Sequence, residues 1–285
     1  MPIAPKIRPG LPYDICEPDE RFADEWVRDN LAVRVYGRYG DGRKGALVLH
    51  FHGGSFTGGD LESGAPIARM LASSGAVVVS LDYPLAPAHP FPAAIEAGYA
   101  ALEWTWRARG RLAGPRARLF VAGEEAGGNL AAAMALMARD RRFPPLAGQI
   151  LLSPMLDACL GTASLRRSHA GAASCRWAVG WRQYLLEGRG TDHPYAMPGH
   201  TQRLTGLPPA LVLTAADDPL RDESLSYLRR LRAAGVVAKS CVLDGRAGWL
   251  TAPGVSANRS VCWVEPVRTA FQRFLNGAGD DVRTC

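Results

Sequence analysis

The stretch that decides the fold reads Val121-Ala122-Gly123-Glu124-Glu125-Ala126-Gly127-Gly128-Asn129-Leu130. An apolar run typical of a buried strand leads into it, and an alanine-rich run typical of a helix leads out of it. Gly123 and Gly127 each lie two residues from Glu125, and glycine lets a strand and a helix approach each other closely. The pattern therefore predicts a strand, a sharp turn that presents the side chain of Glu125, and a helix.

Outward from this turn, apolar runs and helical segments alternate in both directions along the chain. Strands are predicted over 46–51, 77–81, 119–122, 149–153, 211–215 and 240–243, with an outer strand over 31–39, and helices over 19–29, 63–74, 91–107, 126–139, 222–234 and 263–275. This alternation predicts an α/β protein with a mostly parallel central sheet that helices cover on both faces.

The 285 residues are expected to form one large domain over 31–285, preceded by an N-terminal arm or partial cap over 1–30. The segment 156–206 breaks the alternation, is rich in tryptophan and arginine, and is predicted to be helical over 176–187. Ligands of open α/β sheets bind at the carboxyl ends of the strands. An insertion of this kind therefore predicts a lid or cap segment over that end of the sheet.

Composition and charge limit the kinds of partner that this protein is expected to bind. The net charge of +6 comes almost entirely from arginine, and the densest basic run, over 107–118, reads as a solvated surface, so no nucleic-acid partner is expected. Neither a secretory signal nor an apolar run near the ~18 residues that span a bilayer is visible. The six scattered cysteines form no CxxC pair and are expected to be free thiols. These features predict a cytoplasmic protein without membrane insertion or a metal centre.

Five segments resemble the hormone-sensitive-lipase-like, or bacterial carboxylesterase, family of α/β-hydrolases. They are 52–60 (HGGSFTGGD), 81–94 (LDYPLAPAHPFPAA), 123–131 (GEEAGGNLA), 207–210 (LPPA) and 218–223 (DPLRDE). The resemblance covers about residues 31–275 and implies the α/β-hydrolase fold. It also implies three catalytic devices, which are a serine at the sharp turn, backbone amides that hold an oxyanion, and an acid and a histidine that follow in that order.

The resemblance places the amides and the acid in this sequence. The oxyanion hole falls on the amides of Gly53, Gly54, Ser55 and Ala126, where each donor lowers the barrier by a few kcal/mol. The acid falls on Asp218.

This sequence departs from the family at the places of the serine and the histidine. Glu125 stands at the place of the serine, Ala247 stands nearest to the place of the histidine, and the last histidine of the chain is His200. Acylation of a serine needs a hydroxyl and a base that removes its proton. The resemblance thus implies that the ordinary esterase route is absent.

Three functions stay open. The leading hypothesis is an atypical, non-hydrolytic enzyme of small-molecule metabolism, of a biosynthetic kind. In it Glu125 is a general base or acid for a small apolar carbonyl or ester compound. Its reaction would be an isomerisation, elimination, decarboxylation or cyclisation. The alternative is a catalytically inactive protein that binds a small molecule. A weaker alternative is residual esterase activity through a water that Glu125 activates.

Other expectations concern single residues and partners. Glu124 is expected to anchor neighbouring loops, His52 to organise its own loop, and Asp222 to be an acid at the start of a helix. A lid histidine, which would be His169, His193 or His200, is left open as a member of the pocket. No cofactor and no metal are implied, and a homodimer through the closing helix 263–275 is left open.

Overall fold

The computed structural model describes residues 25–26, 31–37, 45–167, 171–186, 192–245 and 263–277. The predicted arm over 1–30, apart from two residues, and Ala247 therefore lie outside the described residues.

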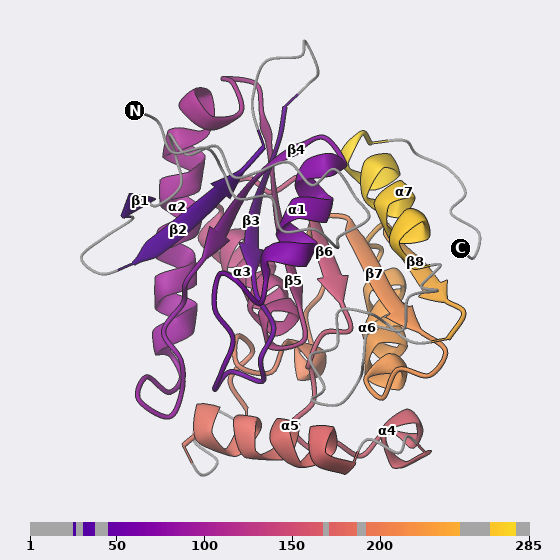
Figure 1. The fold of residues 1–285 in the computed structure, drawn as a ribbon. Coiled ribbons are helices and arrows are strands. Elements are labelled where there is room, and N and C mark those ends of the chain that lie inside the picture. The colour runs from indigo at the N-terminus through magenta and orange to yellow at the C-terminus, as the bar shows by residue number, and fades with distance from the viewer. Residues whose placement is uncertain are drawn as a thin grey trace, which may run out of the picture.

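Among the described residues, eight strands form one sheet in the order β1-β2-β4-β3-β5-β6-β7-β8 (Figure 1). They are β1 (Glu25–Trp26), β2 (Ala32–Tyr36), β3 (Ala46–Phe51), β4 (Ala76–Leu81), β5 (Arg118–Glu124), β6 (Gly148–Leu152), β7 (Ala210–Ala215) and β8 (Ala238–Leu243). All neighbouring strands from β4 to β8 in this order are parallel. β2 is antiparallel both to β4 and to β1. Every residue of β3, β4, β6 and β7 is buried, which explains why these strands are continuous apolar runs.

Helices cover both faces of the sheet and bury two apolar clusters (Figure 1). On one face lie α1 (Ala65–Ser73) and α7 (Val264–Leu275), and on the other lie α2 (Ala93–Leu112), α3 (Ala126–Arg141) and α6 (Arg221–Ala233). The central helix α3 is buried from Ala126 to Ala138, because it packs on the middle of the sheet. The predicted fold class, a mostly parallel sheet flanked by helices, is confirmed.

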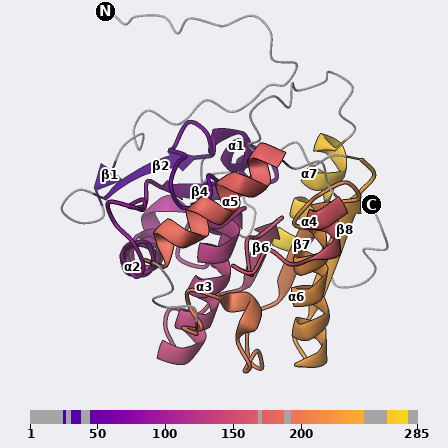
Figure 2. The same cartoon turned by 90° about the horizontal axis from the view of Figure 1, so that it is seen from below.

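The segment 156–206 contains α4 (Ala163–Arg167), α5 (Gly171–Tyr184) and the 3-10 helix Pro198–His200. In Figure 1 α4 and α5 lie beyond the ends at which the parallel strands point, and Figure 2 shows α5 crossing that end of the sheet. The sequence predicted the later part of α5 but not α4, whose five residues are too few for a periodic apolar pattern.

The predicted helix over 19–29 is wrong where the structure can test it. Glu25 and Trp26 form β1 and pair with Val33 and Ala32 of β2. A short isolated helix is marginal in water, whereas the edge strand β2 offers unpaired backbone groups. Strand pairing therefore overrides the local helical pattern.

Two further expectations meet the structure here. Cys241 on β8 is disulfide-bonded, so the prediction that all six cysteines are free thiols is wrong for this residue. Sequence spacing does not reveal which distant cysteines a fold brings together. Cys159 and Cys175 are free and exposed. In the part of the chain that the structure describes, no helix combines the length and the apolar character needed to cross a membrane.

Candidate functional site

The turn between β5 and α3 is built as the sequence predicts. Glu125 lies between the two elements with φ 49° and ψ −115°, a left-handed backbone that glycine adopts more easily than glutamate. A Cβ atom on Gly127 would overlap the carbonyl oxygen of Phe51 at the end of β3, and one on Gly123 would overlap the backbone of Gly127. The two glycines therefore allow the close approach of strand and helix that forces this turn, which we call the elbow.

The loop that follows β3 turns its amides toward the elbow. Gly53 N–H donates to Glu124 Oε1 at 3.1 Å, and Gly54 N–H donates to Glu125 Oε2 at 3.3 Å. The exposed fractions of Glu124 and Glu125 are only 3% and 0%. Two consecutive carboxylates thus accept hydrogen bonds from two consecutive amides of the expected oxyanion hole. Glu124 holds the neighbouring loop, as the sequence predicts.

The remaining two residues of the expected hole are also at the elbow. Ala126 is the first residue of α3 and is fully buried. Ser55 is fully buried too, and its φ of 59° places it in the left-handed region. The structure therefore brings together Gly53, Gly54, Ser55, Glu125 and Ala126, while their roles stay predictions.

His52 organises the loop, as expected. Its Nδ1 atom lies 2.8 Å from the Gly53 carbonyl oxygen, and its ring stacks on Tyr83 with ring centroids 4.3 Å apart. The Tyr83 hydroxyl donates to the His52 carbonyl at 2.8 Å. Burial lowers the pKa of His52 below its usual value, although the Gly53 carbonyl and the charge of Glu124 oppose the shift. A neutral ring with a proton on Nδ1 fits these contacts.

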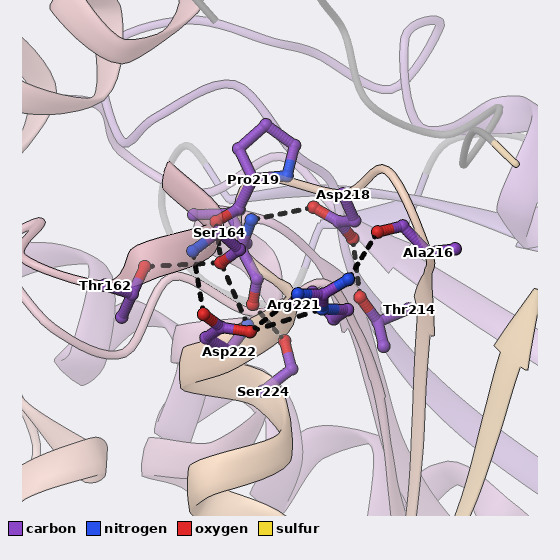
Figure 3. A network of polar contacts seen from close by, with 10 residues as sticks. Thr162, Ser164, Thr214, Ala216, Asp218, Pro219, Arg221, Asp222 and Ser224 are labelled. Carbon is purple, nitrogen blue, oxygen red and sulfur yellow. Dashed lines mark hydrogen bonds and ion pairs between the residues drawn. The ribbon is translucent and has the colours of Figure 1, made fainter. Parts of the chain in front are cut away.

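Asp218 follows β7 and is 1% exposed. Its Oδ2 atom accepts from the Thr214 hydroxyl at 2.8 Å, and Oδ1 accepts from the Leu220 amide at 2.8 Å (Figure 3). Oδ2 also accepts from the Ser153 hydroxyl. Burial raises the pKa of Asp218, and these donors pull it down in part. Both carboxylate oxygens are thus engaged by donors of the chain itself.

Next to Asp218, the start of α6 is tied to α4 (Figure 3). Asp222 Oδ2 accepts from the Ser164 amide at 2.7 Å, and the Asp222 amide donates to the Ser164 hydroxyl at 3.1 Å. Burial works to raise the pKa of Asp222, but donation from the Ser164 amide and from Arg221 lowers it overall. Asp222 is a first-turn acid, as expected, and also links two helices. The serine near the start of α4 was the signal that could have shown this link.

The helix α5 packs directly on the loop after β3. A Cβ atom on Gly180 would overlap the carbonyl oxygen of Ser55. Phe56 stacks on Tyr184 with ring centroids 4.0 Å apart and lies 4.9 Å from the ring of Trp181. Trp177, Trp181 and Tyr184 are buried, which agrees with the packing role that their helical spacing indicates. The contact of Gly180 with Ser55 was not visible in the sequence, because nothing local marks this glycine as touching a distant loop.

The histidines of the segment 156–206 make contacts of their own. The His193 ring lies 5.0 Å from the Phe91 ring, and its Nδ1 atom accepts from the Tyr195 amide at 3.2 Å. His200 Nε2 lies 3.2 Å from Asp157 Oδ1, and half of its side chain is exposed. None of these contacts involves a residue of the elbow. His169 lies outside the described residues.

The described ranges contain no group of three or more histidine, cysteine, aspartate or glutamate side chains that could hold a metal ion. Ala247, the expected place of the missing histidine, lies outside them. The sequence itself has six histidines, and none follows His200.

A sharp strand-turn-helix at the middle of a parallel sheet, with glycine amides on one side and a buried aspartate after a later strand, is the arrangement that defines α/β-hydrolases. The chain belongs to the α/β-hydrolase fold family, whose family model matches residues 48–247.

Similar proteins include enzymes and a receptor. The chain is 39% identical over 216 residues to carboxylesterase NlhH of Mycobacterium tuberculosis, and the alignment covers 74% of this chain and 63% of NlhH. It is 32% identical over 219 residues to gibberellin receptor GID1C of Arabidopsis thaliana, with 72% of this chain and 62% of the receptor covered. The solved esterase of the archaeon Pyrobaculum calidifontis matches with a TM-score of 0.80 at 35% identity, over 92% of this chain and 87% of the esterase.

Proposed function

We propose that this protein binds a small apolar carbonyl or ester compound at the elbow and does not hydrolyse it through a serine. In this proposal Glu125 replaces the nucleophile and Ala247 replaces the histidine, so the chain lacks the pair that acylates a serine. The segment 156–206 acts as the lid over the ligand.

One contact supports binding without turnover most directly, namely the hydrogen bond of 3.3 Å from the Gly54 amide to Glu125 Oε2. An amide that already donates to a carboxylate is not free to stabilise a developing oxyanion. The Gly53 amide is engaged by Glu124 in the same way, at 3.1 Å. That a relative is named a receptor agrees with a binding role for this fold.

A second candidate is the non-hydrolytic enzyme in which Glu125 is a general base or acid for isomerisation, elimination, decarboxylation or cyclisation. The position of its carboxylate favours this candidate, because Glu125 is fully buried at the N-terminus of α3 beside amides that could hold an enolate. For this chemistry the carboxylate must leave Gly54 when the ligand arrives. Residual esterase activity through a Glu125-activated water is the weaker third candidate.

One probe separates the two main candidates. Phenylacetone is a small apolar ketone whose α-protons a general base can remove. Calorimetry measures its binding, and proton NMR in D₂O measures α-proton exchange. We expect saturable binding with exchange no faster than in buffer, and Glu125→Gln should keep the affinity within about threefold because its amide oxygen still accepts from Gly54. Glu124→Gln is the matched control, since it changes the neighbouring carboxylate and leaves Glu125 in place.

Exchange faster than in buffer that disappears in Glu125→Gln but persists in Glu124→Gln would overturn the binding proposal and support the enzyme. A fluorophosphonate probe is expected to leave the protein unlabelled. Labelling would show that another serine acts as a nucleophile and would contradict both candidates.

A further inference from the structure

A buried chain of three side chains lies below the loop that carries the glycine amides. The Ser80 hydroxyl lies 3.0 Å from His50 Nδ1, and His50 Nε2 lies 2.9 Å from Glu124 Oε2. The second oxygen of Glu124, Oε1, accepts from the Gly53 amide at 3.1 Å. The chain therefore runs without a gap from β4 through β3 to the loop.

The sheet register fixes this arrangement. His50 of β3 is paired directly with Ser80 of β4, and parallel pairing brings their side chains to the same face. Glu124 ends the strand β5 on the other side of β3, where His50 pairs with Ala122 two residues before it. The imidazole thus lies between the two neighbouring strands and can reach both partners.

The carboxylate also determines the direction of one of these hydrogen bonds. A ring nitrogen that faces a carboxylate oxygen at 2.9 Å carries the proton, so His50 Nε2–H donates to Glu124. At Ser80 the roles depend on the state of the ring, and Nδ1 accepts from the Ser80 hydroxyl whenever the ring is neutral. Each side chain orients the next one. In the same way, a hydrogen bond to the second ring nitrogen fixes the orientation of a histidine in metal sites.

This chain is not a displaced catalytic triad. Ser80 and His50 are fully buried, and Ser80 belongs to β4, which lies between β2 and β3 inside the sheet. A serine in that place cannot meet a substrate. The hydrogen bonds of these three side chains lead instead to the Gly53 amide.

We propose that His50 is a positioning residue that holds Glu124 on the Gly53 amide and thereby leaves Gly54 as the loop amide at which Glu125 and a ligand oxygen compete. This inference rests on the proposed function in one respect, which is that a ligand meets the amides of the loop after β3. Without the donor on His50, one oxygen of Glu124 is left buried and short of a partner. The carboxylate then turns away from Gly53, and the loop loses its fixed register relative to the elbow.

The test compares two variants of one position by amide hydrogen exchange, followed by NMR on the full chain without ligand. His50→Phe keeps an aromatic ring but removes both nitrogens, whereas His50→Gln keeps a donor for Glu124. We expect the Gly53 amide to exchange roughly tenfold or more faster in His50→Phe, because a hydrogen bond to a charged group is lost. The amides of Val48 and Val121 should keep their rates, and His50→Gln should restore most of the protection.

Unchanged exchange at Gly53 in His50→Phe would overturn the proposal. An equal rise at Gly53, Val48 and Val121 would overturn it as well, because it would show a structural role only. If His50→Phe does not fold, Ser80→Ala replaces it, with a smaller rise that is again confined to Gly53. Since no ligand takes part, failure here is distinct from failure of phenylacetone binding, which tests the proposed function.

Discussion

The elbow and the surroundings of Asp218 lie beyond the ends of β5 and β7, with only β6 between these strands, and both hold a buried carboxylate. At Asp218 the donors are two hydroxyls and an amide, and all three belong to buried residues. At the elbow the donors are the amides of a loop, of which Gly54 is the one that a ligand oxygen could also use under the inference above. The comparison teaches that, under the proposed function, two buried carboxylates at nearby strand ends serve different roles, one in stability and one in recognition. Each prediction below tests that division.

The largest effect is expected at Asp218. Asp218→Ala removes the carboxylate that accepts from the Ser153 and Thr214 hydroxyls and from the Leu220 amide in a buried site. The free energy of unfolding should fall by about 3–5 kcal/mol, the cost of removing one partner from a buried charged network. Urea denaturation measures it. Asp218→Asn keeps one acceptor oxygen and should cost clearly less, and a wild-type midpoint for Asp218→Ala would remove the stability role.

The next effect is expected where α5 meets the loop. Gly180→Ala places a Cβ atom against the carbonyl oxygen of Ser55 and should lower stability by about 1–3 kcal/mol through overpacking. Gly110→Ala in α2 is the matched control, because nothing lies within 4 Å of its Cβ atom, and it should stabilise the helix by roughly 0.5–1 kcal/mol. Thermal unfolding of both variants measures the difference. Equal shifts in the two variants would show that α5 does not press on the loop.

A pH-dependent effect is expected beside Asp218, at Glu223 of α6. Burial, and then the charge of Asp157, raise the pKa of Glu223 well above its usual value. An acid whose pKa rises on folding stabilises the fold below its unfolded pKa of about 4.3, and this contribution is lost as the pH rises through the folded pKa.

Glu223→Gln removes this titration. Relative to wild type, the variant should gain up to about 1.4 kcal/mol for each pH unit between the two pKa values, so its advantage should be larger at pH 8 than at pH 5. Urea denaturation at both values measures the trend. A constant difference between the two proteins would show that Glu223 titrates normally.

The smallest effect on stability is expected at the elbow itself. Glu125→Gly removes a hydrogen bond but also relieves the positive φ of 49°, so the free energy of unfolding should change by less than about 1 kcal/mol. The variant frees the Gly54 amide for an external anion. Formate should therefore raise its melting temperature by a few degrees and leave wild type unchanged, because a ligand stabilises the state that binds it. No response to formate would mean that the elbow amides are not a site for an anion.

The sequence determined most of the scaffold because the parallel strands carry their own signal. Runs such as 46–51 and 211–215 are apolar on both faces, which only a doubly covered sheet explains. The pair Gly123 and Gly127 marked the elbow through the close packing that each allows. By contrast, Glu25 and Trp26 form a strand because they pair with the edge strand β2. No pattern within residues 19–29 indicates that pairing.

The sequence predicted which residues form the site, but not which hydrogen bonds they make. The places of Glu125, Gly53 and Gly54 followed from the motif, but which amide each carboxylate accepts depends on side-chain reach in three dimensions. His50 reads as part of an apolar strand, and only the register with Ser80 shows its role. The pairing of Ser153 with Asp218 joins residues 65 positions apart and has no local signature.

The link between Asp222 and Ser164 has a mechanical consequence. It fastens α4 to α6 by hydrogen bonds, whereas α5 meets the loop after β3 through the close approach of Gly180 to Ser55 and the stack of Tyr184 on Phe56. The two helices are therefore held by different forces, α4 by directional hydrogen bonds and α5 by apolar packing and close fit. A change of side-chain volume at Gly180 or Phe56 should thus displace α5, whereas α4 should move only when its hydrogen bonds to Asp222 are broken.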